Sequence, residues 1–123
     1  MDTDNLNALI ERVIGAAFEV SSVLRPGFLE KVYERALLKE LASRGIEARA
    51  QVGLPVSYKG QLVGEYIADI VVEGELVIEL KCADSFSSEN IAQCINYLKS
   101  SGKKIVLLMN FQKTKVQLKR IIN

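Results

Sequence analysis

Two carboxylates and a lysine lie in segments that otherwise have the composition of buried strands. Asp69 interrupts the apolar residues 67–72, and Glu79 and Lys81 stand two residues apart in the next apolar segment. Acids and lysines are rarely buried without partners. Two facing carboxylates repel each other unless one takes up a proton or a cation lies between them. Hard oxygen ligands suit Mg²⁺ or Mn²⁺, so the pair predicts a divalent-metal site beside which Lys81 orients a water and offsets charge on a phosphate.

The turn between these segments decides whether the three side chains share a face of the sheet. A two-residue turn would pair Asp69 with Ile78 and send Glu79 to the opposite face. A three-residue turn over residues 73–75 pairs Asp69 with Glu79 and brings Lys81 to the same face. We predict the three-residue turn, because hairpin loops of this length that contain glycine are common.

A second interpretation of the hairpin needs no metal. Lys81 would form a salt bridge with one or both acids and serve only the fold, and the hairpin alone supports both interpretations about equally. Glu30, Gln93 and Tyr97 are further candidates for the site. Glu30 follows a Pro-Gly break, while Gln93 and Tyr97 are four apart and project from one side of a helix. Taken singly, each of the three also has an ordinary structural explanation.

The apolar pattern predicts the elements that position these residues. Steps of three and four predict a helix capped at Asp4 and broken at residues 25–27. They also predict a second helix that ends at Gly45 and whose inward side is formed by Leu29, Val32, Tyr33, Ala36, Leu37 and Leu41. A third is capped within residues 85–88 and ends at residues 101–102. Strands are expected over residues 46–58, 61–72, 76–82, 105–109 and 116–122. The order ααβββαββ predicts an α/β fold with a mixed β-sheet flanked by helices, and the length of 123 residues predicts a single domain over residues 1–123.

Composition excludes several classes of function. The chain has no histidine and two cysteines, which removes Ser-His-Asp and Cys-His machinery and leaves too few thiolates for an iron–sulfur or four-cysteine zinc site. No apolar run is long enough to span a bilayer and no signal peptide is apparent, so we expect no membrane association and a cytoplasmic location.

Charge is distributed unevenly along the chain. Residues 1–89 carry nine Lys/Arg against fifteen Asp/Glu, a net charge of −6, whereas residues 90–123 carry seven Lys/Arg and no acid. A basic end can steer a polyanion, although a solvated surface is the simpler explanation of charge alone.

Several of these features together resemble one bacterial family. Residues 27–33, Gly-Phe-Leu-Glu-Lys-Val-Tyr, match the GxxExxY signature, and the chain is similar to the GxxExxY protein family also in Ala68-Asp69, in Glu79-Leu80-Lys81 and in Gln93 with Tyr97. That family is grouped with the RecB-like exonuclease branch of the PD-(D/E)xK nuclease superfamily. The resemblance therefore implies a restriction-endonuclease-like core.

The resemblance also implies roles for residues. Asp69 and Glu79 would be metal ligands, the Leu80 carbonyl a third, and Glu30 a ligand directly or through water. Lys81 would position the nucleophile. The remaining catalytic candidates, which would contact substrate phosphate or order the site, are Gln93 and Tyr97.

The leading functional hypothesis is a Mg²⁺- or Mn²⁺-dependent nuclease that hydrolyses phosphodiester bonds of DNA by metal-activated water. The alternative is a catalytically silent nuclease-fold module that binds nucleic acid or a protein partner, and a third is a purely structural subunit. Because one small domain offers little surface for processive or sequence-specific cutting, we expect a homodimer or a larger protein partner. The contact could use the strand at residues 116–122 or the exposed sides of the first two helices.

Overall fold

A computed structural model gives the structure of the protein and describes residues 2–122. The helices are α1 (Thr3–Leu24), α2 (Glu30–Ser43) and α3 (Ser88–Ser101). The strands are β1 (Ala48–Tyr58), β2 (Gln61–Val72), β3 (Leu76–Lys81), β4 (Ile105–Asn110) and β5 (Gln117–Ile122). The predicted order ααβββαββ is confirmed. Within residues 2–122, no helix combines the length and the apolar character that crossing a membrane requires.

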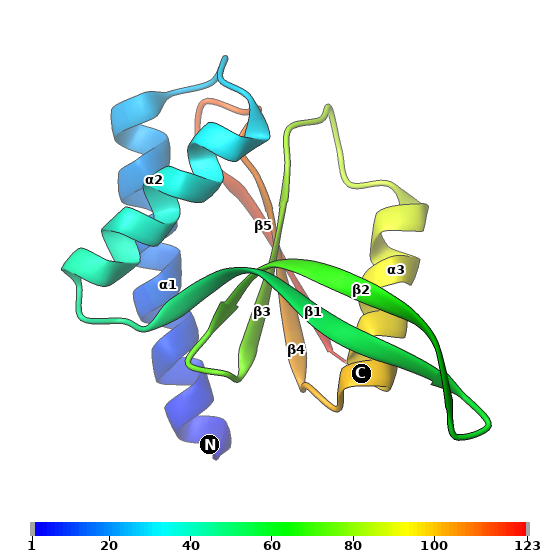
Figure 1. Cartoon of the computed structure of the whole chain (residues 1–123). Coiled ribbons are helices and arrows are strands. Elements are labelled where there is room, and N and C mark those ends of the chain that lie inside the picture. The colour runs from blue at the N-terminus through cyan, green and yellow to red at the C-terminus, as the bar shows by residue number, and fades with distance from the viewer. Residues whose placement is uncertain (1, 123) are drawn as a thin grey trace.

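The strands form one mixed sheet with the order β1-β2-β3-β4-β5. Neighbouring strands are antiparallel except β3 and β4, which are parallel because α3 carries the chain back across the sheet. Helices α1 and α2 cover one face and α3 covers the other (Figure 1). The predicted mixed sheet flanked by helices is therefore confirmed.

The long strands β1 and β2 exchange faces along their length. In a regular strand, residues two apart point to the same face, but Ile70 packs with α1 and α2 whereas Ala68 packs on the α3 side. The two strands pair on both sides of Gln51 and Asp69, which themselves form no ladder pair. Gln51 has a φ of 54°, a backbone conformation that is uncommon for a residue other than glycine. The exchange therefore occurs at the predicted metal ligand Asp69.

The structure corrects some of the predicted element ends. Asp2 rather than Asp4 caps α1, since an Asp2 carboxylate oxygen accepts a hydrogen bond from the Asn5 N–H at 2.8 Å. Leu29 was predicted to point inward, but it is the N-cap residue of α2 and is 79% exposed. The prediction failed because the apolar pattern continues one residue beyond the helix. The cap of α3 is Ser87, within the predicted range.

Strand ends shift by one or two residues as well. The first strand begins at residue 48 rather than 46, because the Ile46 N–H still donates to the Leu41 carbonyl at 2.9 Å and closes the end of α2. The third strand ends at Lys81, one residue before the prediction.

Candidate active site

Asp69 and Glu79 meet where strands β2 and β3 separate. The ladder pairs Val72 with Leu76 and ends at the pair of Ile70 with Ile78, which confirms the three-residue turn and its register. Beyond that point, Asp69 bonds to β3 through its side chain.

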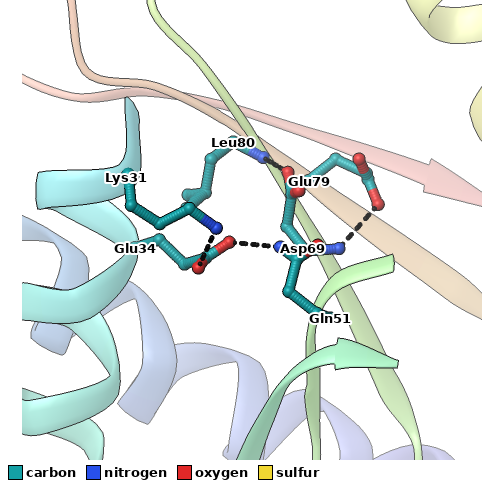
Figure 2. A network of polar contacts seen from close by, with 6 residues as sticks. All are labelled: Lys31, Glu34, Gln51, Asp69, Glu79 and Leu80. Atoms are coloured by element: carbon teal, nitrogen blue, oxygen red, sulfur yellow. Dashed lines mark hydrogen bonds and ion pairs between the residues drawn. The ribbon is translucent and has the colours of Figure 1, made fainter. Parts of the chain in front are cut away.

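The Asp69 contacts replace the ladder at this point. Its Oδ2 accepts a hydrogen bond from the Leu80 N–H at 2.8 Å, and its own N–H donates to Glu79 Oε1 at 3.3 Å (Figure 2). Since Asp69 bonds to β3 through both its backbone N–H and its side chain, and Glu79 accepts one of these bonds, the two carboxylates are held near the same gap in the sheet.

The three predicted residues do not share a face in the simple way that the register suggested. Glu79 and Lys81 alternate with residues of the α1–α2 core and face α3. Asp69 lies at the face exchange and lines a pocket on the α2 side. The prediction of one common face is therefore correct for Glu79 and Lys81 and wrong for Asp69, because β2 changes its alternation at that residue.

Glu79 occupies a nearly buried position, with 8% of its surface exposed. Its Oε1 also accepts a hydrogen bond from the Tyr66 hydroxyl, and the Tyr66 ring stacks on Tyr97 of α3. Burial, and next the charge of Asp69, raise the pKa of Glu79 from 4.5 to about 7, although its hydrogen bonds and Lys81 act in the other direction. The site therefore favours a proton or a cation on this carboxylate at neutral pH.

Tyr66 was missed in the sequence. Burial, and next the adjacent Glu79 carboxylate, raise its pKa above the usual range for tyrosine. It therefore stays protonated and donates to Glu79. The pKa of Tyr97 is raised by the same two causes in the same order. An aromatic side chain three residues before Asp69 was the available signal, but its contact with Glu79 depends on the face exchange between them.

Lys81 is half-buried beside these acids, yet none of the ion pairs found within residues 2–122 involves it. Its charge nevertheless lowers the pKa values of Glu79 and Glu30 against the larger effect of burial. The ammonium group is thus close enough to influence both carboxylates without pairing with either. This geometry does not favour the interpretation of Lys81 as a structural salt bridge.

A pocket of about 240 Å³ opens on the α2 side of Asp69. Its lining includes Glu30, the first residue of α2, together with Glu34, Gln51 and Leu80. Burial raises the pKa of Glu30, and the charges of Asp69 and Glu34 add to that rise. The structure therefore brings Glu30 into the electrostatic environment of Asp69.

Glu34 is a second residue that the sequence interpretation missed. It is 5% exposed, and its carboxylate accepts hydrogen bonds from Lys31 Nζ at 2.9 Å and Gln51 Nε2 at 2.7 Å (Figure 2). It follows Glu30 by one helical turn and lies between the buried Tyr33 and Leu37, which was the available signal. This network ties α2 to β1 at the face exchange.

Tyr33, the last residue of the GxxExxY segment, has a structural role. Its hydroxyl donates to the Arg25 carbonyl at 2.6 Å and accepts from the Phe28 N–H at 3.2 Å, and its ring stacks on Phe111 at 4.8 Å between centroids. These contacts fix the loop that leads into Glu30.

The two α3 candidates separate in the structure. Tyr97 reaches the site through its stack on Tyr66. Gln93 lies one turn earlier and is exposed, and no hydrogen bond found within residues 2–122 joins it to Asp69, Glu79 or Lys81. The helix thus brings one of the two to the carboxylates.

The donor set fits a hard divalent cation with few protein ligands. No group of three or more His, Cys, Asp or Glu side chains suited to hold a metal occurs in the part of the chain that the structure describes. Mg²⁺ is commonly bound by one or two carboxylates and keeps several waters. The crowded pair of Asp69 and Glu79, with the raised pKa of Glu79, matches that kind of site.

Two of three comparisons with known proteins found a match. A search of curated proteins found no match. Among solved structures, an alkaline exonuclease from Laribacter hongkongensis has a similar fold, with a TM-score of 0.52 and 13% sequence identity over 92% of this chain and 82% of that one. The sequence model of the PD-(D/E)XK nuclease superfamily matches residues 7–121. Because this match spans nearly the whole chain, the protein belongs to the PD-(D/E)XK nuclease superfamily.

Proposed function

We propose that this protein is a Mg²⁺- or Mn²⁺-dependent deoxyribonuclease with Asp69 and Glu79 as its metal ligands. The observation that carries the proposal is the meeting of two carboxylates in the gap between β2 and β3, beside a lysine that pairs with neither. Membership of a nuclease superfamily supports hydrolysis of nucleic acid. The choice of DNA rests on the sequence resemblance.

The chain's own residues prepare the site for hydrolysis. The Leu80 N–H fixes the Asp69 carboxylate, and the Tyr66 hydroxyl fixes that of Glu79. The Leu80 carbonyl is proposed as a third ligand, and Glu30 as a ligand directly or through water. When bound, a divalent ion would supply positive charge at the scissile phosphate and acidify a water molecule.

Lys81 is proposed to act on the substrate. Since no ion pair to another residue of the described part of the chain, 2–122, holds it, its ammonium group can orient the attacking water and offset charge that builds on the phosphate. Gln93 and Tyr97 are proposed to contact substrate or to order the site, and for Tyr97 the stack on Tyr66 supports the ordering role.

Cleavage assays with variants test this function. We expect Glu79→Gln and Lys81→Met to abolish degradation of DNA in Mg²⁺ or Mn²⁺ while circular dichroism shows an unchanged fold. Glu19→Gln and Lys39→Met, on the exposed sides of α1 and α2, are matched controls that should retain cleavage. A wild-type protein that degrades neither DNA nor RNA with either metal, or site variants that cut as well as the controls, would contradict the proposal.

Calorimetry separates the enzyme from a catalytically silent nuclease-fold module. The enzyme should bind Mn²⁺ and lose that binding in Asp69→Ala. Because only two carboxylates and a carbonyl are proposed as firm ligands, the affinity for Mn²⁺ should be modest and should rise when DNA is added. Absence of Mn²⁺ binding with and without DNA would favour the silent module.

A homodimer or a larger protein partner remains part of the proposal. Strand β5 is an edge of the sheet, and its Ile122 is 70% exposed. Edge strands that expose apolar side chains can pair with another chain. Light scattering at micromolar concentration tests the dimer. A molecular mass that corresponds to a monomer would exclude the homodimer and leave a complex with a larger protein as the remaining proposal. The cytoplasmic location also remains a prediction, which cell fractionation tests.

A further inference from the structure

The registers of β3, β4 and β5 place residues of β5 in line with the candidate active site. Glu79 pairs with Leu108, which pairs with Lys119. Two residues further along β3, Lys81 pairs with Asn110, which pairs with Gln117. Side chains of paired residues point to the same face of a sheet. Lys119 and Gln117 therefore share the α3 face with Glu79 and Lys81.

The distance across these rows suits a nucleic-acid strand. Two interstrand spacings amount to about 10 Å. At a rise of about 3.4 Å per nucleotide, that distance spans roughly three nucleotides of a stacked strand. The rows themselves are covered, since Leu108 and Asn110 are buried and Asn110 Nδ2 donates to the Ala83 carbonyl at 2.7 Å. A strand whose scissile phosphate lies at Lys81 would therefore pass over the connection from β3 to α3 to reach the exposed side chains of β5.

A groove of about 560 Å³ lies at that end of the rows. Its lining comes from the connection from β3 to α3, from the beginning of α3, from the connection between β4 and β5, and from β5. Two lysines line it, Lys113 and Lys119, and Lys119 is exposed. The acid in the lining is Asp84, whose Oδ1 accepts a hydrogen bond from Gln112 Nε2 at 2.8 Å. The groove therefore carries a net positive charge. Both of its lysines come from residues 90–123, which contain no acid.

The lining also includes an apolar surface. Phe86 and Ile91 are partly buried against the core on the α3 side and contribute to the groove. Single-stranded nucleic acids bind to grooves in which lysines follow the phosphates and an aromatic ring stacks on a base. A paired base inside a duplex cannot reach such a ring, so this combination favours a single strand.

We propose that the groove formed by Phe86, Lys113, Gln117 and Lys119 binds a single nucleic-acid strand beside the active site. The alignment of this groove with the scissile phosphate rests on the proposed function, whereas binding itself does not require cleavage. Lys113 and Lys119 contact phosphates, and Phe86 stacks on an unpaired base.

Fluorescence anisotropy with a short fluorescein-labelled oligothymidylate in EDTA tests the groove without cleavage. The logarithm of affinity should fall with the logarithm of salt concentration, and each lost phosphate contact should reduce that slope by about 0.7 for a single strand. Lys113→Gln with Lys119→Gln should therefore reduce the slope by about 1.4. At about 0.1 M salt this change corresponds to roughly 25-fold weaker binding. The matched control Lys39→Gln, on α2 across the sheet, should leave slope and affinity unchanged.

Phe86→Leu tests the stacking contact while an apolar side chain is kept. We expect binding of oligothymidylate to weaken about fivefold or more, with no change in the salt slope. A duplex of the same length should bind more weakly to the wild type and be indifferent to Phe86→Leu. Urea unfolding of each variant excludes a change of fold as the cause.

The outcomes separate the groove from the nuclease function. If the lysine double variant binds as the control does, or the wild type does not bind the oligonucleotide, the groove proposal is wrong even when the protein cuts DNA. If a duplex binds more tightly than the single strand, the choice of a single strand is wrong. If the variants weaken binding as expected but the wild type cuts nothing in Mg²⁺ or Mn²⁺, the groove stands and the nuclease proposal fails.

Discussion

The raised pKa of Glu79 predicts that the protein loses stability as the pH rises toward neutrality. Glu79 has a pKa of about 7 in the folded chain against 4.5 when unperturbed, chiefly because it is buried and next because of Asp69. Between these two values the folded state binds more protons than the unfolded state, so the free energy of unfolding decreases as the pH increases. The decrease starts near pH 4.5 and is complete above pH 7.

The magnitude follows from the size of the shift. Each pKa unit corresponds to about 1.4 kcal/mol, so the whole shift is worth about 3 kcal/mol. About 2.5 kcal/mol of this falls between pH 5 and pH 8. For a chain of this length, such a change lowers the melting temperature by roughly 10 °C.

The variant Glu79→Gln isolates this contribution. Glutamine keeps an oxygen that can accept the hydrogen bonds from Tyr66 and from the Asp69 N–H, but it cannot ionise. Urea unfolding in EDTA at pH 5 and pH 8 should show that the wild type loses about 2.5 kcal/mol more than the variant does. The exposed Glu19→Gln is the control and should follow the wild type.

Two results would refute this reasoning. If wild type and Glu79→Gln lose equal stability between pH 5 and pH 8, the carboxylate does not titrate in that range. If the wild type becomes more stable as the pH rises while the variant does not, the pKa of Glu79 is depressed, and the crowding of the two acids is relieved in another way.

Three further predictions concern stability, each measured by urea unfolding. Tyr33→Phe should cost about 1–2 kcal/mol, because the hydroxyl bonds two backbone groups in the loop before α2; an unchanged stability would mean that water replaces these bonds. Glu34→Gln should lower the free energy of unfolding by about 1–3 kcal/mol, because its buried carboxylate bonds a lysine and a glutamine. Its control Glu40→Gln, in a more exposed ion pair, should lower the free energy of unfolding by less than about 1 kcal/mol. Gly74→Ala should cost about 1 kcal/mol, since Gly74 has a φ of 67° but open space for a Cβ. Gly64→Ala, without a positive φ, should be nearly neutral, and equal costs at both glycines would contradict the backbone explanation.

Local patterns in the sequence determined the elements and the strand register. Helical periodicity identifies the three helices, and turn residues with positive φ, such as Gly74, mark the hairpins. The three-residue turn then fixes which residues of β2 and β3 face each other. These signals act between residues close in sequence, and for that reason they can be recognised without the structure. The types and spacing of Asp69, Glu79 and Lys81 likewise indicated an acidic site on this hairpin.

Tertiary structure decided how those residues meet and what surrounds them. The face exchange at Gln51 and Asp69 sends Asp69 toward α2. On one side of the exchange the paired strands β1 and β2 pack against α1 and α2, and on the other side they pack against α3. The contacts of Tyr66 with Glu79 and of Gln51 with Glu34 join residues 13 and 17 apart in the sequence. No periodicity records such contacts, because each depends on the path of the backbone between the two residues and on the helix that covers them. The sequence by itself thus determined which acids could form a site, and only the packing of the helices on the twisted sheet decided where each carboxylate points.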